Sequence, residues 1–268
     1  MGILNCTPDS FYASSRSVTV DQAVAAARRM IDTGADMLDI GGESSRPGSD
    51  YVSAGQEIER VVPVISAVRE FSDIPISVDT RKRVVAEAAV AAGADLINDI
   101  SALRDDPELA AFAADRELPV ILMHMRGTPR TMQLNPCYED TLGEICAELR
   151  QFAYAAQQSG IARAQILLDP GIGFGKRLQD NLAILRGIAE LRELGYPLVI
   201  GASRKSFIGA LTDAGAPRPP EERLAGSLAV HAIAAQAGAD ILRVHDVPET
   251  VDVLRVLAEL TLSEVGVS

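Results

Sequence analysis

The feature that most constrains the fold is a unit that recurs along the chain: a short apolar run, a polar cluster, then a helical pattern. Eight such runs occur, at residues 2–4, 37–40, 74–78, 96–97, 120–123, 166–168, 198–200 and 241–244. Short, mostly apolar and often β-branched runs are typical of strands buried on both faces of a sheet. Eight strand–helix units in 268 residues predict one α/β domain over residues 1–268, folded as a (β/α)8 or TIM barrel. A doubly wound open sheet is the alternative, since periodicity does not show whether a sheet closes.

The segments between the runs have helical spacing and share one ending. In "DQAVAAARRMIDTGAD", residues 21–36, the apolar positions recur at helical intervals and Gly34 supplies a stop. Gly-Ala-Asp closes this segment and two others, at 93–95 and 238–240, just before the next run. Such an ending suits a helix that turns tightly back into a parallel strand.

Composition limits the classes of partner. The formal net charge of −12 argues against general binding of nucleic acid or of an anionic membrane surface. No apolar run reaches the roughly 18 residues expected of a membrane span. Three cysteines without metal-ligand spacing, Cys6, Cys137 and Cys146, predict a reducing, cytoplasmic environment.

Polar residues follow every one of the eight runs. In a (β/α)8 barrel the carboxyl ends of the strands face the active site. These ends carry Asn5, Asp39, Asp79, Asn98, His124, Asp169, Ser203 and Arg243. A purely structural barrel needs no such ring, so the sequence predicts a site for a polar ligand.

Cations are concentrated after particular strands. Arg46, Arg204, Lys205 and Arg243, with His245, predict an anion site at the barrel mouth of an acidic protein. In "GASRKSFIGAL" a helix begins near Ser206, where free backbone N–H groups favour an anion. A capped helix with solvated cations is the alternative interpretation of this segment.

The acids predict a second kind of recognition. Asp79, Asn98 and Asp169 end apolar strands, and buried carboxylates need donors. Their own segments offer no neutralising cation, although Lys205 could reach across the barrel. A ligand with a guanidine-like edge would satisfy them, because it presents two parallel donors to one carboxylate. A metal bound through oxygen and a purely structural network remain alternatives. His124 alone is weak evidence, and His231 falls inside a helical pattern and is predicted to be structural.

The string "DPGIGFGK", residues 169–176, suggests a phosphate loop but does not fit one. A Walker loop requires Gly-Lys followed by Ser or Thr, and here Arg177 follows Lys176. The string also lacks Gly-x-Gly-x-x-Gly. We therefore interpret it as a glycine-permitted turn that lets a ligand lie close to backbone, with Phe174 as an apolar wall.

Eight of these motifs together resemble one family. "GILNCTPDSF", "GGESSRPG", "SVDT", "DLINDI", "LMHM", "DPGIGFGK", "GASRKS" and "RVHD" occur in order over nearly the whole chain. They closely resemble the dihydropteroate synthases, pterin-binding (β/α)8 enzymes of folate synthesis. The resemblance implies condensation of 6-hydroxymethyl-7,8-dihydropterin pyrophosphate with 4-aminobenzoate, giving 7,8-dihydropteroate and pyrophosphate.

The resemblance also implies a role for each matching residue. The implied pterin site consists of Asp79, Asn98, Asp169 and Lys205. The implied pyrophosphate site consists of Asn5, Arg243 and His245, with Asn5 ligating Mg²⁺ and Arg243 also stacking on the pterin. The implied aminobenzoate site consists of Ser45, Arg46, Pro47, Phe174, Lys205 and Ser206. Met125 and Gly201 complete the implied substrate-binding set, and the implied catalytic residues are Asp79, Lys205, Arg243 and His245. The family further implies a homodimer.

The implied mechanism is SN1-like. The C–O bond to pyrophosphate breaks first, Mg²⁺ and the Arg–His cluster stabilise the leaving charge, and the pocket carboxylates stabilise the pterin-methyl cation. Mobile loops after the first two strands then complete the aminobenzoate site. The amine attacks last, so no strong enzymic nucleophile is needed, in keeping with the lack of a convincing Cys–His or Ser–His pair in the sequence.

Some features depart from the family pattern. After "TPDSF" the family usually continues Ser-Asp-Gly-Gly, whereas residues 12–16 here read "YASSR". Loss of these glycines predicts a stiffer first loop. Ser45 stands where Thr is usual and keeps the hydroxyl. The family usually has an N-terminal extension across the barrel bottom, and this sequence begins almost at the first strand. The ordinary "GFGK" pattern predicts inhibition by sulfonamides that compete with aminobenzoate.

Three rival functions follow from the same residues. Methyltetrahydrofolate-dependent methyltransferases share the barrel and the acidic pterin pocket, but they would not need "TPDSF" and "SRKS". The altered first loop motivates a catalytically inactive pterin-binding paralogue, against which the retained "SRKS" and "RVHD" segments argue. A phosphate-binding barrel isomerase lacks a clear Glu base here.

Overall fold

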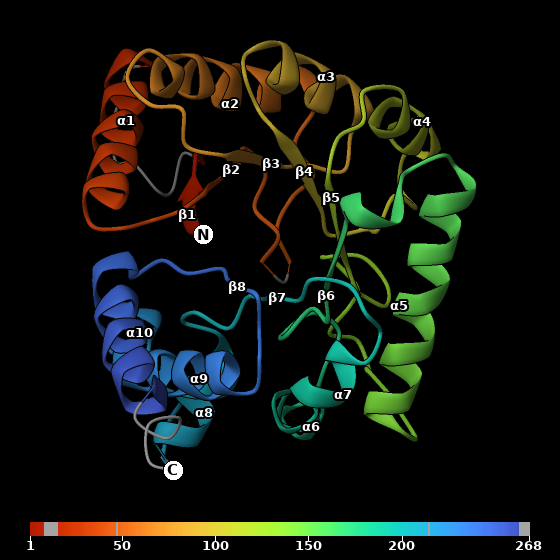
Figure 1. Ribbon diagram of the computed structural model, residues 1–268, viewed down its shortest axis with the longest axis vertical. Coiled ribbons are helices and arrows are strands. Elements are labelled where there is room, and N and C mark those ends of the chain that lie inside the picture. The colour runs from red at the N-terminus through yellow and green to blue at the C-terminus, as the bar shows by residue number, and fades with distance from the viewer. Residues whose placement is uncertain (8–15, 47, 214, 263–268) are drawn as a thin grey trace.

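A computed structural model describes residues 1–7, 16–46, 48–213 and 215–262 and contains eight parallel strands (Figure 1). Six strands of four residues form one sheet in chain order: β1 (Gly2–Asn5), β2 (Leu38–Gly41), β3 (Ile76–Asp79), β4 (Leu96–Asp99), β5 (Val120–Met123) and β6 (Ile166–Asp169). Two strands of two residues form a second sheet: β7 (Val199–Ile200) and β8 (Ile241–Leu242). Parallel bridges from Leu168 to Leu198 and from Gly2 to Val244 join the two sheets at both edges. The sheet therefore closes, and the (β/α)8 barrel is confirmed over the doubly wound alternative.

Helices surround the strands on the outside of the barrel (Figure 1). They are α1 (Arg16–Asp32), α2 (Ala54–Arg69), α3 (Arg83–Ala91), α4 (Pro107–Asp115), α5 (Thr141–Gln158), α6 (Leu178–Arg186), α7 (Ile188–Arg192), α8 (Ser206–Thr212), α9 (Leu224–Gln236) and α10 (Val247–Leu262). Short 3₁₀ turns, η2 (Arg163–Gln165) and η3 (Pro220–Glu222), precede β6 and α9. Among these helices none is long and apolar enough to cross a bilayer.

Alternation along each strand divides the core into layers. In β5, Val120 and Leu122 point outward into the main apolar cluster between strands and helices. Ile121 points inward to a smaller cluster inside the barrel. Met123, at the carboxyl end, joins a third cluster beside the polar ring. One strand therefore contributes to the outer core, the barrel interior and the wall of the site.

The Gly-Ala-Asp endings form tight turns at the opposite, amino-terminal end of the barrel. Gly93 and Gly238 adopt φ of +114° and +96°, a left-handed conformation that glycine enters without a Cβ penalty. Asp95 then accepts the backbone N–H of Ile76 (2.7 Å), so the turn after α3 is attached to the strand before it. Asp240 accepts the backbone N–H of Leu198 (2.8 Å) in the same way.

Candidate active site

A pocket opens among the carboxyl ends of the strands, where the sequence predicted a polar ligand. It encloses about 320 Å³, open solvent at its mouth included. Eight of the predicted site residues line it: Ser45, Asp79, Asn98, Asp169, Phe174, Gly201, Lys205 and Arg243. Ile100, Met123, Gly171 and Ile172 complete the lining. The pocket therefore combines charged groups with one apolar wall.

Arg243 lies at the centre of the acidic groups. Its Nε donates to Asp39 Oδ2 (2.6 Å) and its Nη2 donates to Asp79 Oδ2 (2.8 Å). Asn98 Nδ2 adds a further hydrogen bond to the same oxygen of Asp39 (3.2 Å). The neutralising cation thus comes from outside the acids' own segments, as expected, but it is Arg243 after the last strand that donates to Asp39 and Asp79.

Burial and charge shift the pKa values of these groups. Burial and the neighbouring Asp39 raise the pKa of Asp79 to about 7, against the effect of Arg243. Burial also raises the pKa of Asp169, although the Gly171 backbone N–H donates to its Oδ1 (2.7 Å). Burial works against the charged form of Arg243, yet Asp39 and Asp79 raise its pKa overall. The acids thus have an elevated proton affinity and can respond to an incoming N–H donor.

Lys205 joins the polar part of the pocket to its apolar wall. Its Nζ lies 3.9 Å from the centroid of the Phe174 ring, a cation–π contact. Burial, followed by the charge of Arg243, lowers the pKa of Lys205 to about 8. The side chain therefore carries its charge near neutral pH while lying beside both an aromatic face and the barrel acids.

Three glycines shape the loop after β6. Gly171, Gly173 and Gly175 have φ of +67°, +83° and +61°. A Cβ at Gly171 would lie 1.9 Å from the carbonyl oxygen of His124, and one at Gly175 would lie 2.9 Å from that of Arg126. At Gly171 and Gly175 a side chain is therefore disfavoured by the positive φ and would also collide with a neighbouring carbonyl oxygen. This confirms the predicted glycine-permitted turn.

A buried lysine ends this loop. Lys176 is 4% exposed, and its Nζ contacts His124 Nδ1 (3.0 Å) and donates to the Phe174 carbonyl (3.0 Å). His124 Nε2 in turn contacts Glu148 Oε2 (3.0 Å). Burial lowers the pKa of Lys176 to about 7 and that of His124 to about 4. This chain of contacts fixes the carbonyl of the residue that forms the apolar wall.

The cations after β7 point in two directions. Arg204 has φ of +57° and its Nε donates to Asp246 Oδ2 (3.0 Å), so it forms an ion pair with the loop after β8. Ser206 is exposed where α8 begins. The predicted cation cluster is therefore divided: Lys205 and Arg243 line the pocket, and Arg204 does not.

Ser203 and His245 form a pair that the sequence analysis did not identify. Ser203 Oγ accepts the backbone N–H of His245 (3.2 Å) and contacts its Nδ1 (3.1 Å). Burial, followed by the charge of Arg243, lowers the pKa of His245 to about 3. Neither residue belongs to the described pocket lining, so this Ser–His pair joins two loops and does not form a nucleophile over the pocket.

The other predicted residues are not in the pocket lining or lie outside the described residues. Asn5 is half-buried at the end of β1, and Arg46 is exposed in the loop after β2. Met125 is 1% exposed and packs in the apolar cluster with Met123, Phe174 and others, behind the pocket lining. Pro47 lies outside the described residues, and so do residues 12–15 of the segment that departs from the family pattern. The prediction of a stiff first loop therefore falls outside the described residues.

Asp39 was predicted as a member of the polar ring, but neither it nor Lys176 was assigned a role in the site. Asp39 is fully buried, and its signal was a carboxylate inside the apolar run "MLDIG". Lys176 was seen only as part of a failed phosphate motif. His231 is fully buried in α9 and its Nδ1 contacts Thr250 Oγ1 (3.2 Å), which confirms its predicted structural role.

Comparison with known proteins gives a consistent result. The family model described as pterin binding enzyme matches residues 1–245. The dihydropteroate synthase of Escherichia coli strain K12 is 47% identical over 263 residues, covering 98% of this chain and 91% of that protein.

Solved structures agree with the sequence relatives. Dihydropteroate synthase of Xanthomonas albilineans, solved with 4-aminobenzoic acid, has a TM-score of 0.90 at 46% identity and covers 97% of this chain and 92% of that one. The Yersinia pestis enzyme, solved as a sulfonamide drug complex, has a TM-score of 0.91 at 45% identity, covering 98% and 94%. From this fold, this pocket and these relatives, the chain belongs to the dihydropteroate synthase family of pterin-binding enzymes.

Proposed function

We propose that this enzyme condenses 6-hydroxymethyl-7,8-dihydropterin pyrophosphate with 4-aminobenzoate to give 7,8-dihydropteroate and pyrophosphate. The observation that carries the proposal is the pocket itself, which is lined by Asp79, Asn98 and Asp169 together with Lys205. A pterin presents an amino group beside a ring N–H, and two such donors match a carboxylate.

In the proposed order of events the pyrophosphate leaves before the amine attacks. Asp79 and Asp169 are charged or easily charged groups that would stabilise a positive pterin-methyl centre. Lys205 and His245, with Arg243 as it exchanges part of its acid contacts for phosphate oxygens, would stabilise the leaving group. The Phe174 ring and Ser45, with Arg46, Pro47 and Ser206, would hold the aminobenzoate. Met125 and Gly201 would support these walls.

Mg²⁺ is the metal we propose for the pyrophosphate. Among the described residues there is no cluster of three or more His, Cys, Asp or Glu, so a closed all-protein cage is not available there. The side-chain oxygen of Asn5, at the carboxyl end of β1, is a ligand type that Mg²⁺ accepts, and Mg²⁺ typically takes its other ligands from phosphate and water. When bound, the ion would neutralise the departing pyrophosphate.

We also propose a cytoplasmic homodimer. Cys6, Cys137 and Cys146 are free, as in proteins of a reducing compartment. Leu211, Ile233, Val256 and Leu260 are more than half exposed on the neighbouring helices α8, α9 and α10 (Figure 1). Apolar residues gathered on adjacent helices suit a self-complementary interface. Sedimentation equilibrium should give twice the monomer mass, and a monomer at all concentrations would refute the dimer.

The function is tested by pyrophosphate release from Mg²⁺, dihydropterin pyrophosphate and 4-aminobenzoate, with each component omitted in turn. We expect release that requires all three. Asp169→Asn should lower kcat/KM by about thirtyfold, because a charge-assisted hydrogen bond to the substrate is lost. Glu87→Gln, in an exposed ion pair with Arg83 on α3, is the matched control. Pterin binding by calorimetry without any release would instead identify an inactive pterin-binding protein.

The same assay can test inhibition by sulfonamides. We propose that they compete with 4-aminobenzoate here, supported by the unaltered "GFGK" loop and by the Yersinia pestis relative solved with such a drug. Inhibition should weaken as 4-aminobenzoate rises. Unchanged turnover at saturating drug and low 4-aminobenzoate would exclude the idea.

A further inference from the structure

The loop between β2 and α2 carries side chains that the proposed function gives to 4-aminobenzoate, yet its described residues, 42–46 and 48–53, form no helix or strand. Ser45 lines the pocket from this loop, and the Gly48 backbone N–H donates to the Pro129 carbonyl in the loop after β5 (3.2 Å). Such a segment needs fixed points at its ends if Ser45 is to keep its position. Glu43 provides one of them.

Glu43 connects the two ends of the loop. Its Oε1 accepts the backbone N–H of Val52, nine residues further along and next to the N-cap of α2 (3.1 Å). Burial disfavours its charged form, yet the contacts from Lys82, Val52 and Arg81 lower its pKa. Glu43 is therefore ionised and is held by donors from more than one segment.

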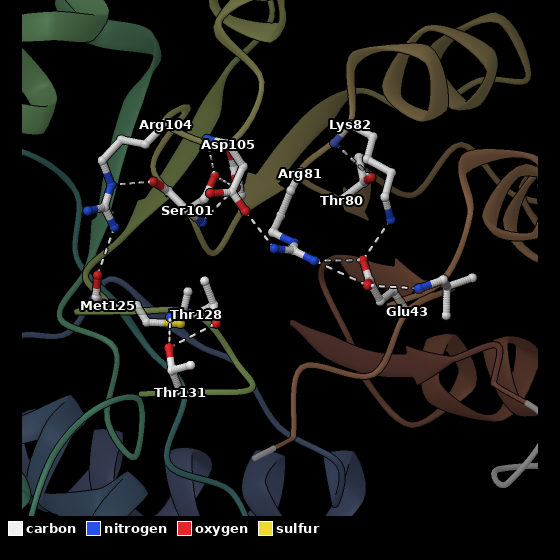
Figure 2. A network of polar contacts seen from close by, with 12 residues as sticks. Glu43, Thr80, Arg81, Lys82, Ser101, Arg104, Asp105, Met125, Thr128 and Thr131 are labelled. Atoms are coloured by element: carbon white, nitrogen blue, oxygen red, sulfur yellow. Dashed lines mark hydrogen bonds and ion pairs between the residues drawn. The ribbon is translucent and has the colours of Figure 1, made fainter. Parts of the chain in front are cut away.

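The donors belong to the loop that follows the pterin acid. Arg81 Nη2 donates to both carboxylate oxygens of Glu43 (3.2 Å each), and Lys82 Nζ donates to Oε2 (2.7 Å). Figure 2 shows these two side chains converging on Glu43 from the loop after β3, which begins immediately after Asp79. The three side chains are only 10–13% exposed, so these pairs are less screened than surface pairs.

Arg81 and Lys82 also form ion pairs with acids other than Glu43. Arg81 Nη1 donates to Asp105 Oδ2 (2.5 Å) in the loop after β4, as Figure 2 also shows. Lys82 Nζ donates to Glu57 Oε2 (2.6 Å), and Glu57 is fully buried in α2. The network therefore joins the loops after β2, β3 and β4 at one side of the mouth.

We propose that Glu43 is a positioning residue for the second substrate: it sets the place of the β2–α2 loop, and thus of Ser45, relative to the pterin pocket. The inference rests on the proposed function. Glu43, Arg81 and Lys82 are not part of the described pocket lining, so the pterin does not depend on them directly. Removing the contacts of Glu43 with Val52, Arg81 and Lys82 should therefore raise the KM for 4-aminobenzoate far more than the Kd for the pterin substrate.

The test compares Glu43→Ala, Glu43→Gln and the control Glu87→Gln. Glu43→Ala should raise the KM for 4-aminobenzoate about tenfold or more, as expected for loss of charge-assisted bonds, while the calorimetric Kd for dihydropterin pyrophosphate stays within about twofold. Glu43→Gln keeps an oxygen for the Val52 N–H but loses the charge, so its KM should rise by about threefold. Glu87→Gln should match wild type. If the alanine variant is unfolded, the glutamine variant carries the comparison.

A second readout locates the effect. Hydrogen exchange of the Val52 amide should speed up strongly in Glu43→Ala and only slightly in Glu43→Gln. A general loss of stability would instead raise both substrate constants or lower kcat alone. Wild-type turnover with an unchanged 4-aminobenzoate KM in both Glu43 variants would overturn this inference alone. A wild-type protein that releases no pyrophosphate would overturn the proposed function and, with it, the assignment of this loop.

Discussion

Lys176 shows how one buried amine can tie a loop to its neighbours. Its Nζ is within hydrogen-bond distance of His124 Nδ1 and of the Phe174 carbonyl. A Cβ added at Gly171 would lie 3.4 Å from the same Nζ. Asp169 and Glu148 favour its charged form, while burial, Arg126 and Lys205 oppose it, and the net effect lowers its pKa to about 7. The amine is thus a hydrogen-bonding group more than a fixed charge.

This lysine makes stability depend on pH in a defined direction. The folded pKa of about 7 lies below the unfolded value of 10.5, so above pH 7 the unfolded chain binds more protons and the contribution of Lys176 to stability rises with pH. We expect the stability difference between wild type and Lys176→Met to grow by about 2 kcal/mol from about pH 7.5 to about pH 9.5. Urea unfolding at each pH measures it. His124, with its pKa of about 4, does not titrate in that range, so a constant difference would contradict the assignment.

The residues of the pocket were easier to predict than their partners. Strand-end acids and cations are visible because a polar residue interrupts an apolar run. The contact from Arg243 to Asp39 and Asp79 spans 204 and 164 residues along the chain, and nothing in local spacing encodes it. Met123 and Met125 likewise lie two residues apart at one strand end, and Met123 belongs to the pocket lining whereas Met125 does not.

Among the elements, the Gly-Ala-Asp turns repeat one arrangement. In two copies an arginine from the end of an earlier helix, Arg69 of α2 or Arg192 of α7, donates to the glycine carbonyl and to the aspartate. The sequence repeat predicted a tight helix-to-strand turn, and the structure adds a bond from the aspartate to the previous strand. The third copy differs, because the corresponding strand amide, that of Gly2, donates to the Met37 carbonyl instead (2.8 Å).

These turns should affect stability without affecting catalysis. Asp95→Ala and Asp240→Ala would each leave a strand N–H, of Ile76 or Leu198, without its acceptor, and both strand residues are buried. We expect a loss of about 2 kcal/mol each in urea unfolding, with kcat/KM unchanged because the turns lie at the opposite end of the barrel. Asp36→Ala is the matched control and should cost less than about 0.5 kcal/mol. Equal losses in all three would argue against the strand bond.

The elements themselves were largely predictable. All eight apolar runs are strand-forming regions, because residues buried on both sides must be apolar in both alternating directions. The split into α6 and α7 at Gly187 was not predicted, since the apolar spacing continues across it. Closure of the sheet was expected from the number of units and not from any one of them.

Around the whole barrel, the strands are not paired to the same extent. Strands β1 to β6 pair over their length, whereas β7 and β8 pair over two residues and join the larger sheet through single bridges. The pocket lies across this junction: Asp79 and Asn98 come from the large sheet, and Lys205 and Arg243 follow the small one. The Arg243 ion pairs therefore reinforce a wall that has few backbone bonds.

Hydrogen exchange should reveal this inequality. The Ile241 and Arg243 amides, which donate to Leu198 and Ile200 carbonyls, should exchange about tenfold or more faster than the Ile97 amide of the large sheet. Adding dihydropterin pyrophosphate should slow exchange of the Arg243 amide, because the substrate would bridge the two sheets. Uniform protection across all strands, unchanged by substrate, would show that the barrel opens as one unit.

The glycines of the β6 loop have a consequence for the design of inhibitors. At Gly171 and Gly175 a single added carbon would collide with backbone, and at Gly173 it would come within 3.1 Å of Lys205. A compound that rests on the peptide groups of this loop thus faces a surface whose chemical identity cannot be altered by point mutation without deforming the pocket. A compound that relies on Ser45 or the exposed Arg46 faces side chains that can be exchanged. Drug resistance should arise far more readily against the second compound than against the first.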